Sequence, residues 1–373
     1  KTNKGVKEMI NIKYIQKRIK SGTAKKLALR LVLLSGFCSG AAPVSSQEIE
    51  RVRWQVPTGA PTTVPGLDAI VHASKWLSEI SNGHVTLRTY EPGELIPGFE
   101  VSSAVEKGTY PAGFTYTAYD QGSMPEASLF SYIPFYLGPI DYIAWHYSGG
   151  GEELLVDAYS KRNIHPILCG VTGPQLGGWF TSPVSSIEDL KDLNFRIAGF
   201  GADVLSELGV NVSSISAAET YQALERGVVD AAKLGQPLVG LKFGFPEIAR
   251  YYMVPDWAQP STATHLMINK GKWNELAVPT RRLIEMSCKA ATLYTLSETE
   301  FLQGKAIKAI NEAGASPIQL SENDLTKLKE ITDQVLSKNS ENSAAFARVL
   351  RSQVEFSESY KKWSQQGYLP NKY

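Results

Sequence analysis

The sequence predicts an α/β protein of two lobes with a helical tail at its C-terminus. Short strands alternate with helices from residue 52 to residue 234, and long, charge-rich helical stretches follow from residue 283 onward. The chain has 373 residues, of which 43% are apolar and 20% are charged. This length and apolar content can fill one large or two ordinary domains, and they exclude a disordered or fibrous protein.

Residues 1–46 are expected to direct export. They carry ten Lys and Arg residues against one acid, and the apolar run 27–37 is followed by small residues. This order is typical of a secretory signal peptide and predicts a periplasmic protein. A membrane anchor is disfavoured because the run is shorter than the ~20 residues that span a bilayer, and Arg30 interrupts it. Lipid attachment at Cys38 is disfavoured because a bulky phenylalanine precedes it.

The chain after residue 46 is acidic. It keeps 28 basic and 36 acidic side chains, a net charge of −8. Such a body argues against nucleic acid as a partner, since phosphate binding needs clustered cations. Two of the three cysteines, Cys169 and Cys288, also remain there. Export permits a disulfide, but both lie in apolar contexts and are predicted to be separate thiols.

The first elements follow from alternation and helical spacing of apolar residues. Val52, Trp54 and Val56 alternate with polar neighbours and predict a strand. Apolar residues at helical spacing predict a helix over 67–80, ended by Gly83. The same signals predict a strand at 85–89, a helix ending at 107, and a strand with a loop at 110–119.

The central stretch shows two helix starts. Ser185 with Glu188, and Ser216 with Glu219, have the spacing of capping boxes. Strands are predicted at 194–197, 210–215 and 228–234, with helices at 202–208 and 216–226 between them. This alternation predicts a largely parallel sheet. The tail is predicted as helices over 283–302 and 324–363, with a break at 314–317.

Catalytic motifs are missing from the sequence. The five histidines lack zinc-ligand spacing, and no nucleophile elbow, phosphate loop or calcium loop occurs. Gly199 and Gly201 begin like a dinucleotide fingerprint, but Val204 stands where its third glycine belongs, so a tight turn is expected. The run 149–151 is expected to be a glycine-rich helix entry. The sequence therefore favours a binding protein over an enzyme.

Several motifs resemble the periplasmic solute-binding subunits of TRAP transporters, and most closely their α-keto acid/lactate-binding branch. The likeness covers residues 50–365 and is carried by the segments 175–180, 189–197, 219–224 and 227–232, with 94–98 and 252–257 in support.

The resemblance implies a two-lobed periplasmic binding protein fold with a hinge, plus C-terminal helices. Its lobes would be residues 47–173 with 262–300, and 174–261 with 301–345, followed by a tail at 346–373. Such a protein closes on a small organic acid and delivers it to TRAP membrane permease subunits. The branch also implies a homodimer through the C-terminal helices, with packing of the tail on its own lobes as the alternative.

The resemblance places Arg196 at the position that holds the substrate carboxylate, which suits the fixed fork of a guanidinium. The alternative is a surface ion pair with Asp189 or Asp192. Apolar walls are expected from tryptophans, and contacts from the first lobe are expected from tyrosines. The predicted ligand-binding residues are Arg196, Gln175, Lys233, Trp179, Trp257, Tyr119 and Tyr116.

The chain departs from the resembled branch at a metal ligand. In that branch a metal ion bridges substrate and protein through a glutamine matching Gln175, a glutamate, and a main-chain oxygen that would here belong to Leu234. Lys233 stands in place of the glutamate, and an ammonium repels a metal ion. No cofactor, sodium or calcium is therefore expected. Lys233 is expected to donate to the substrate instead, with a turn towards solvent as the alternative.

Asp256 stands where the relatives tend to carry glycine, and it is a candidate to neutralise a buried Lys233. If the two side chains meet, a keto or hydroxy monocarboxylate is the expected ligand. If they do not, two cations would favour a dicarboxylate or a sulfonate. A ligand-sensing accessory protein on the same fold is the other alternative.

Overall fold

The computed structural model describes residues 49–369, and the predicted signal peptide lies outside them. Within the described part, no helix combines the length and the apolarity needed to cross a membrane.

The first lobe is built on strands that pair in two groups. The pair β1 and β2 is parallel, whereas β10 lies antiparallel between β3 and β4. A bridge between Thr58 and Phe114 links the two groups. The strands are β1 (Val52–Pro57), β2 (Val85–Tyr90), β3 (Ala112–Thr115), β4 (Ile164–Thr172) and β10 (Thr262–Asn269). The helices around them are α3 (Ala69–Ile80), α4 (Val101–Glu106), α5 (Pro139–Ser148), α6 (Gly151–Ser160) and α11 (Lys270–Glu275), with the short turns η1 (Gly98–Glu100), η2 (Thr117–Asp120) and η3 (Pro125–Phe130).

The second lobe is built on a sheet of order β11-β9-β5-β8-β6-β7. Its strands are β5 (Gly178–Phe180), β6 (Asn194–Arg196), β7 (Asn211–Ser213), β8 (Ala231–Ala232), β9 (Tyr251–Val254) and β11 (Ser316–Gln319). Its helices are α7 (Phe200–Leu208), α8 (Thr220–Glu225), α9 (Pro237–Lys242) and α10 (Phe245–Ile248), with η4 (Ile187–Asp192) and η5 (Ala217–Glu219).

The prediction of a largely parallel sheet is confirmed for the strands on which it rested, since β6 pairs in parallel with β7 and with β8. It is wrong for the sheets as a whole, which are mixed. Every pair that involves β5 or β10 is antiparallel. The reason is topological. These two strands follow crossings from one lobe to the other, at 173–177 and 255–261, and not the strand–helix–strand connections that enforce parallel pairing.

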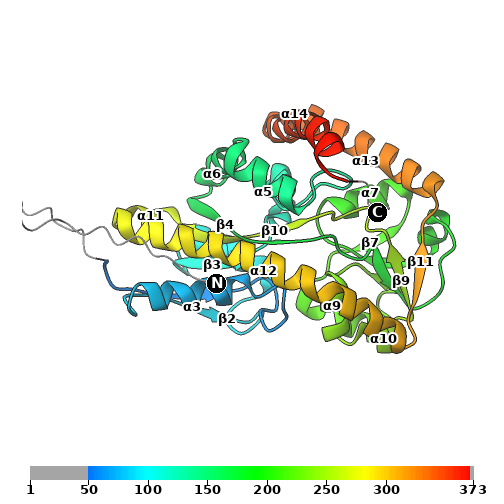
Figure 1. The fold of residues 1–373 in the computed structure, drawn as a ribbon, viewed down its shortest axis with the longest axis horizontal. Coiled ribbons are helices and arrows are strands. Elements are labelled where there is room, and N and C mark those ends of the chain that lie inside the picture. The colour runs from blue at the N-terminus through cyan, green and yellow to red at the C-terminus, as the bar shows by residue number, and fades with distance from the viewer. Residues whose placement is uncertain (1–48, 370–373) are drawn as a thin grey trace, which may run out of the picture. The chain divides into compact units, whose positions relative to one another are not determined.

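Helix α12 (Val278–Glu312) joins the lobes a third time. It packs on β4 and α3 in the first lobe and on α9 in the second, and Figure 1 shows it running along both. Its partner β4 carries Cys169, which forms a disulfide with Cys288 of α12, with their Cα atoms 4.4 Å apart. The expectation of two separate thiols is therefore wrong. The packing of β4 on α12 decides the pairing, and no local pattern reveals it across 119 residues.

The tail is two helices, α13 (Glu322–Asn342) and α14 (Ala344–Gly367), where the sequence predicted one. Ser343 separates them, because its side chain accepts from the backbone N–H of Phe346 and caps α14. Helix α13 packs on α7, and α14 packs on η3, α5 and α6. Phe346 and Val349 are buried in these contacts, and Gln353 donates to the carbonyl of Leu129.

One capping box is shifted by a residue from its predicted place. Ser186 and Asp189 form it, not Ser185 and Glu188. Glu188 instead pairs with lysine side chains, one of them Lys327 of α13.

Candidate functional site

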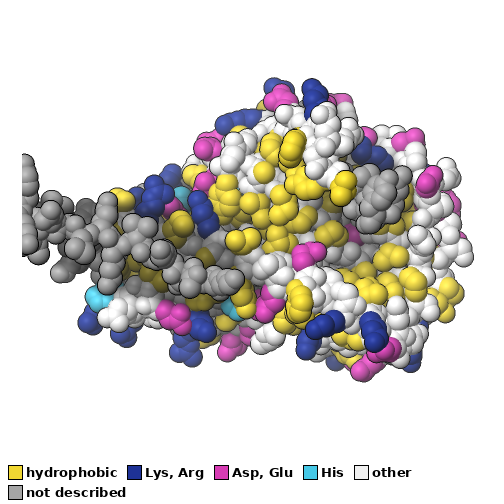
Figure 2. All heavy atoms as spheres, viewed as in Figure 1, with side chains coloured by type: hydrophobic (Ala, Val, Ile, Leu, Met, Phe, Trp, Pro, Cys, Tyr) yellow, Lys and Arg dark blue, Asp and Glu magenta, His cyan; other side chains and the backbone are white. Residues whose placement is uncertain are grey.

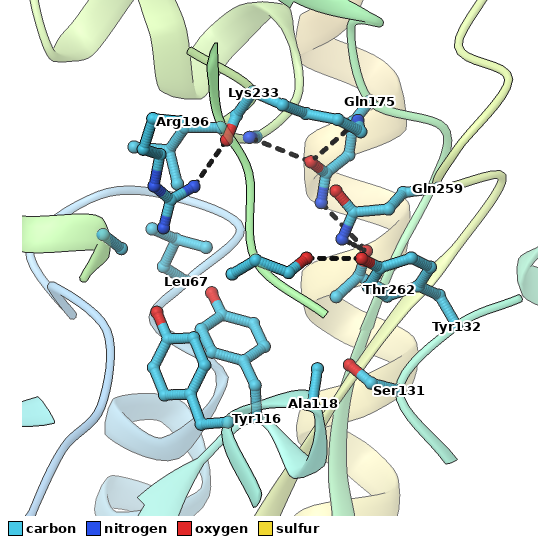
Figure 3. A pocket seen from close by; sticks show the side chains of 15 residues that line it. Leu67, Tyr116, Ala118, Ser131, Tyr132, Gln175, Arg196, Lys233, Gln259 and Thr262 are labelled. Carbon is cyan, nitrogen blue, oxygen red and sulfur yellow. Dashed lines mark hydrogen bonds between the residues drawn. The ribbon is translucent and has the colours of Figure 1, made fainter. Parts of the chain in front are cut away.

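A small cavity lies between the two lobes (Figure 3). Its volume is about 50 Å³. The first lobe lines it with Tyr116, Ala118, Tyr119, Ser131 and Tyr132, and the second with Gln175, Arg196, Ala198, Ala217, Lys233, Leu234 and Gly235. Leu67, Gln259 and Thr262 complete the lining.

Arg196 lies at the end of β6 with 3% of its surface exposed. Its Nε and Nη2 donate to the carbonyl of Ile215, at 2.8 and 2.6 Å, and its Nη1 donates to the carbonyl of Lys233 at 2.5 Å. A guanidinium has five N–H donors, so these bonds leave one donor on each terminal nitrogen, and the Tyr119 hydroxyl is a further hydrogen-bond partner of the group. Burial lowers the pKa of Arg196, but an arginine stays charged in a protein.

The described residues give this buried cation no carboxylate partner within salt-bridge distance. The expected alternative, an ion pair with Asp189 or Asp192, is absent among them. Buried charges in proteins are normally paired, because isolation from water is costly. An anion in the cavity would supply the partner that Arg196 lacks.

Lys233, by contrast, is fully paired. Its Nζ donates to Asp256 Oδ2 at 2.8 Å, to the carbonyl of Leu176 at 2.9 Å and towards Gln175 Oε1 at 3.5 Å. Neither Lys233 nor Asp256 exposes its side chain. Burial lowers the pKa of Lys233, and the charge of Asp256 acts in the opposite direction. The two side chains meet, so the second cation of the cavity is neutralised.

Asp256 is held on its other side by the backbone. Its Oδ1 accepts from the N–H groups of Ala258 and Gln259, and its Oδ2 also accepts from that of Gln175. The side chain of Gln175 is similarly engaged, since its Oε1 accepts from Gly235 N at 3.0 Å and its Nε2 donates to a threonine hydroxyl at 2.9 Å. Lysine, carboxylate and amide therefore form one fixed polar wall.

Tyrosines form the opposite wall of the cavity, contributed by the first lobe (Figure 3). The rings of Tyr116 and Tyr119 lie 5.3 Å apart, and Phe99 packs on Tyr119. Burial raises the pKa of both phenols, although the charge of Arg196 partly opposes this. Both hydroxyls are therefore neutral at physiological pH and can donate hydrogen bonds.

Tyr132 reaches across the cleft between the lobes. Its hydroxyl donates to the carbonyl of Ala198 and accepts from the backbone N–H of Gly201. A side chain at Gly199 would clash with this ring, and the backbone there has a φ of +77° that favours glycine. The glycines that resembled a dinucleotide motif thus form the turn that receives Tyr132. Sequence reasoning missed Tyr132, because nothing local marks it.

Five of the seven predicted ligand-binding residues line the cavity: Arg196, Gln175, Lys233, Tyr116 and Tyr119. The two tryptophans do not. Trp179 is buried between Phe245 and Tyr252 in the core of the second lobe, and Trp257 packs on Phe135.

Comparison with known proteins agrees with this architecture. The family described as bacterial extracellular solute-binding protein, family 7 (DctP), matches residues 58–342. A monocarboxylate 2-oxoacid-binding periplasmic protein of Nostoc sp. is 30% identical over 316 residues, which are 85% of this chain and 87% of that protein.

Two solved structures of TRAP solute-binding proteins are similar as well, each 27% identical and matched over 85% of this chain. The first, from Bordetella bronchiseptica, is covered over 95% of its length with a TM-score of 0.83 and holds calcium and picolinate. The second, from Pseudoalteromonas atlantica, is covered over 97% with a TM-score of 0.81 and holds sodium and pyruvate. The chain belongs to the DctP family, and it is a solute-binding protein of the TRAP transporter type and not an enzyme.

Proposed function

We propose that this protein captures a small 2-oxo or 2-hydroxy monocarboxylate between its lobes, with Arg196 as the carboxylate anchor. The observation that carries the proposal is a buried guanidinium whose terminal nitrogens each keep one donor beyond their bonds to backbone carbonyls, and which has no carboxylate partner among the described residues. The fork of these donors matches the two oxygens of a carboxylate. The names of the relatives, which bind 2-oxoacids, pyruvate and picolinate, support the same chemistry.

The charge of the cavity favours one carboxylate over two. Arg196 and Lys233 are the charged residues of the lining, and Asp256 neutralises the lysine. One unpaired positive charge remains, so a dicarboxylate would bring a negative charge for which the described lining offers no cation.

The tyrosine wall is proposed to recognise the second functional group of the acid. The neutral phenols of Tyr116 and Tyr119 face the cavity, and a phenol can donate to a keto oxygen or accept from a hydroxyl. One site would therefore accept both 2-oxo and 2-hydroxy acids.

Binding is proposed to need no metal ion, although the two solved relatives hold sodium or calcium. The residues present do not fit a metal. Asp256, the carbonyl of Leu176 and Gln175 offer oxygens of the kind that sodium and calcium prefer, but all three surround the ammonium of Lys233. An ion placed beside that ammonium would be repelled.

The remaining parts of the proposal concern location and partners. We expect a periplasmic protein that delivers its acid to TRAP membrane permease subunits.

A homodimer through the C-terminal helices also remains a prediction. Helix α14 buries Phe346 and Val349 against its own chain, but it leaves Trp363 61% exposed. Figure 2 shows hydrophobic side chains over α5, α6 and α14, where a second copy could pack, and light scattering on the purified protein tests this.

Calorimetric titration tests the proposed function. Pyruvate, lactate and malonate are titrated into the protein in chelator-treated buffer, with choline in place of sodium. Pyruvate or lactate should bind and malonate should not. Arg196→Gln should weaken binding at least about a hundredfold, because charge-assisted hydrogen bonds contribute about 1.5–3 kcal/mol each.

The matched control is Arg226→Gln, an exposed arginine of the same lobe, which should bind as the wild type does. Thermal unfolding without ligand confirms that each variant folds. Tighter binding of malonate than of pyruvate would contradict the monocarboxylate, and binding that appears only with sodium or calcium would contradict the metal-free site.

A further inference from the structure

A second cluster of polar side chains lies outside the cavity, between α3 and α12. Asp68 and His72, one helical turn apart at the start of α3, face Glu298 of α12. One ligand atom from each of the three residues lies within 4.8 Å of the others, and His72 Nε2 is 3.3 Å from Asp68 Oδ2. An imidazole and two carboxylates are common metal ligands in proteins.

The charge of this cluster is not balanced by basic side chains. In the part of the chain that the structure describes, neither Asp68 nor Glu298 forms a salt bridge with a lysine or an arginine. Two carboxylates at this separation repel each other, and a divalent cation between them would remove the repulsion.

The surroundings also hold the three side chains in place. Gly66 N–H donates to Asp68 Oδ1, and the Tyr294 hydroxyl donates to Glu298 Oε1. The ring of His72 lies against the Tyr294 ring, with the centroids 4.7 Å apart. Hydrogen bonds behind metal ligands orient them in this way in known sites.

We propose that Asp68, His72 and Glu298 bind a divalent transition-metal ion, with Zn²⁺ as its simplest representative. The imidazole selects against calcium and magnesium, which prefer all-oxygen sites. Water would complete the coordination, as in other sites with three protein ligands. The side chains of His72 and Asp68 are 24% and 17% exposed, which leaves the ion a path from solvent.

The bound ion would affect the cavity through the turn next to it in the chain. Asp68 directly follows Leu67, which lines the cavity, and its carboxylate holds the turn at Gly66. The site would therefore tie the turn that carries Leu67 to α12, the helix that runs along both lobes. None of the three ligands is among the residues that line the cavity with Arg196 and Lys233.

Zinc titration of the full chain, free of affinity tags and of any organic acid, tests the proposal. We expect one zinc ion per chain with a micromolar dissociation constant and a rise in Tm. Asp68→Asn, His72→Gln and Glu298→Gln should each weaken zinc binding about tenfold or more. The control His84→Gln, a first-lobe histidine whose Nδ1 bonds the carbonyl of Ile49, should bind zinc as the wild type does.

A second measurement guards against variants that fold poorly. Co²⁺ bound through an imidazole has visible absorption bands, which should appear in the wild type and be lost in His72→Gln. No zinc binding by the wild type, or zinc binding that survives all three substitutions, would overturn the proposal. Because no organic acid is present, the result does not depend on the proposed transport function.

Discussion

At the scale of single residues, the polar wall of the cavity is an ion pair buried without any exposed surface. Lys233 is satisfied by Asp256, by a backbone carbonyl and by the amide of Gln175. Such a pair adds little net stability over apolar residues of the same size. Removing one partner is different, because it leaves the other charge buried and alone.

Asp256→Asn should therefore destabilise the protein by about 3–5 kcal/mol. The double variant Lys233→Met with Asp256→Asn should recover most of this loss, because it removes the orphaned charge as well. Urea unfolding followed by circular dichroism measures both. A single variant within about 1 kcal/mol of the wild type would show that the pair is not buried as described.

The sequence predicted much of the site at this scale, but it left open whether Lys233 is neutralised by its candidate partner Asp256. The resemblance placed Arg196 and Lys233 correctly on the cavity, because their motif continues through neighbouring strands. Whether Asp256 meets Lys233 depends on the crossing between the lobes, which no local pattern specifies. Trp179 was expected at the ligand because tryptophans line many sites, but a central strand covered by α9 and α10 buries it instead.

At the scale of elements, α5 and β10 each bury a histidine in the core of the first lobe, His146 and His265. His146 is 1% exposed and His265 is fully buried, and none of their four ring nitrogens has a hydrogen-bond partner in the described structure. Burial lowers the pKa of His146 to about 3, with Lys289 acting in the same direction. Burial, together with His146, lowers the pKa of His265 as well.

These histidines predict acid sensitivity. Their pKa is near 6.5 in the unfolded chain and lower in the fold, so the unfolded state binds protons first as pH falls. Stability should be complete above pH 6.5 and should fall by about 2–3 kcal/mol per histidine down to pH 4.5. Urea unfolding across this range, compared with the double variant His146→Leu and His265→Leu, measures the effect. Parallel pH curves for the two proteins would rule it out.

The elements themselves were predicted with uneven success. The strands predicted at 52–56, 85–89 and 194–197 are present as β1, β2 and β6. The strand predicted at 228–234 is only β8, because its ladder partners β5 and β6 are short. Strands β4, β10 and β11 were not predicted. The edge strand β11 is largely exposed and lacks the apolar pattern of a buried strand, whereas β4 and β10 are buried on both faces and so lack the alternation that marks a half-buried strand.

At the scale of the whole molecule, the lobes are held together by side chains that cross the cleft. Besides Tyr132, Gln121 of the first lobe donates to Asp203 of α7 at 2.6 Å. Burial raises the pKa of Asp203 to about 6, and the bond from Gln121 opposes this shift. Burial of Asp203 between the lobes therefore favours its protonated form.

Ligand affinity should therefore depend on whether Asp203 is protonated. Opening should expose Asp203 to water, and the loss of burial, which is the larger cause of the shift, should return its pKa towards 3.8 even though the opposing bond from Gln121 is lost as well. Closure is then favoured as pH falls through 6 and disfavoured above it. Pyruvate should bind about three- to tenfold more tightly at pH 5 than at pH 7. Asp203→Asn should lose this dependence, and Glu207→Gln on the same helix should keep it. A flat calorimetric profile for the wild type would contradict the coupling.

The two-lobed architecture was predictable because alternating strands and helices and an extended family motif pointed the same way. The disulfide and the mixed sheets were not, since both arise where the chain crosses between lobes or packs across more than a hundred residues. Features set by neighbouring residues could be predicted, and features set by contacts between distant residues could not.

The hydroxyl of Tyr132 is bonded into the turn before α7 and joins the two lobes beside the cavity. On the proposed function, release of an acid from Arg196, which is 3% exposed, would require these bonds to break. The residence time of the acid would then reflect how long the lobes stay joined, and not only how strongly the anion is held. A permease that displaces this one phenol would unload the protein without ever competing for the anion.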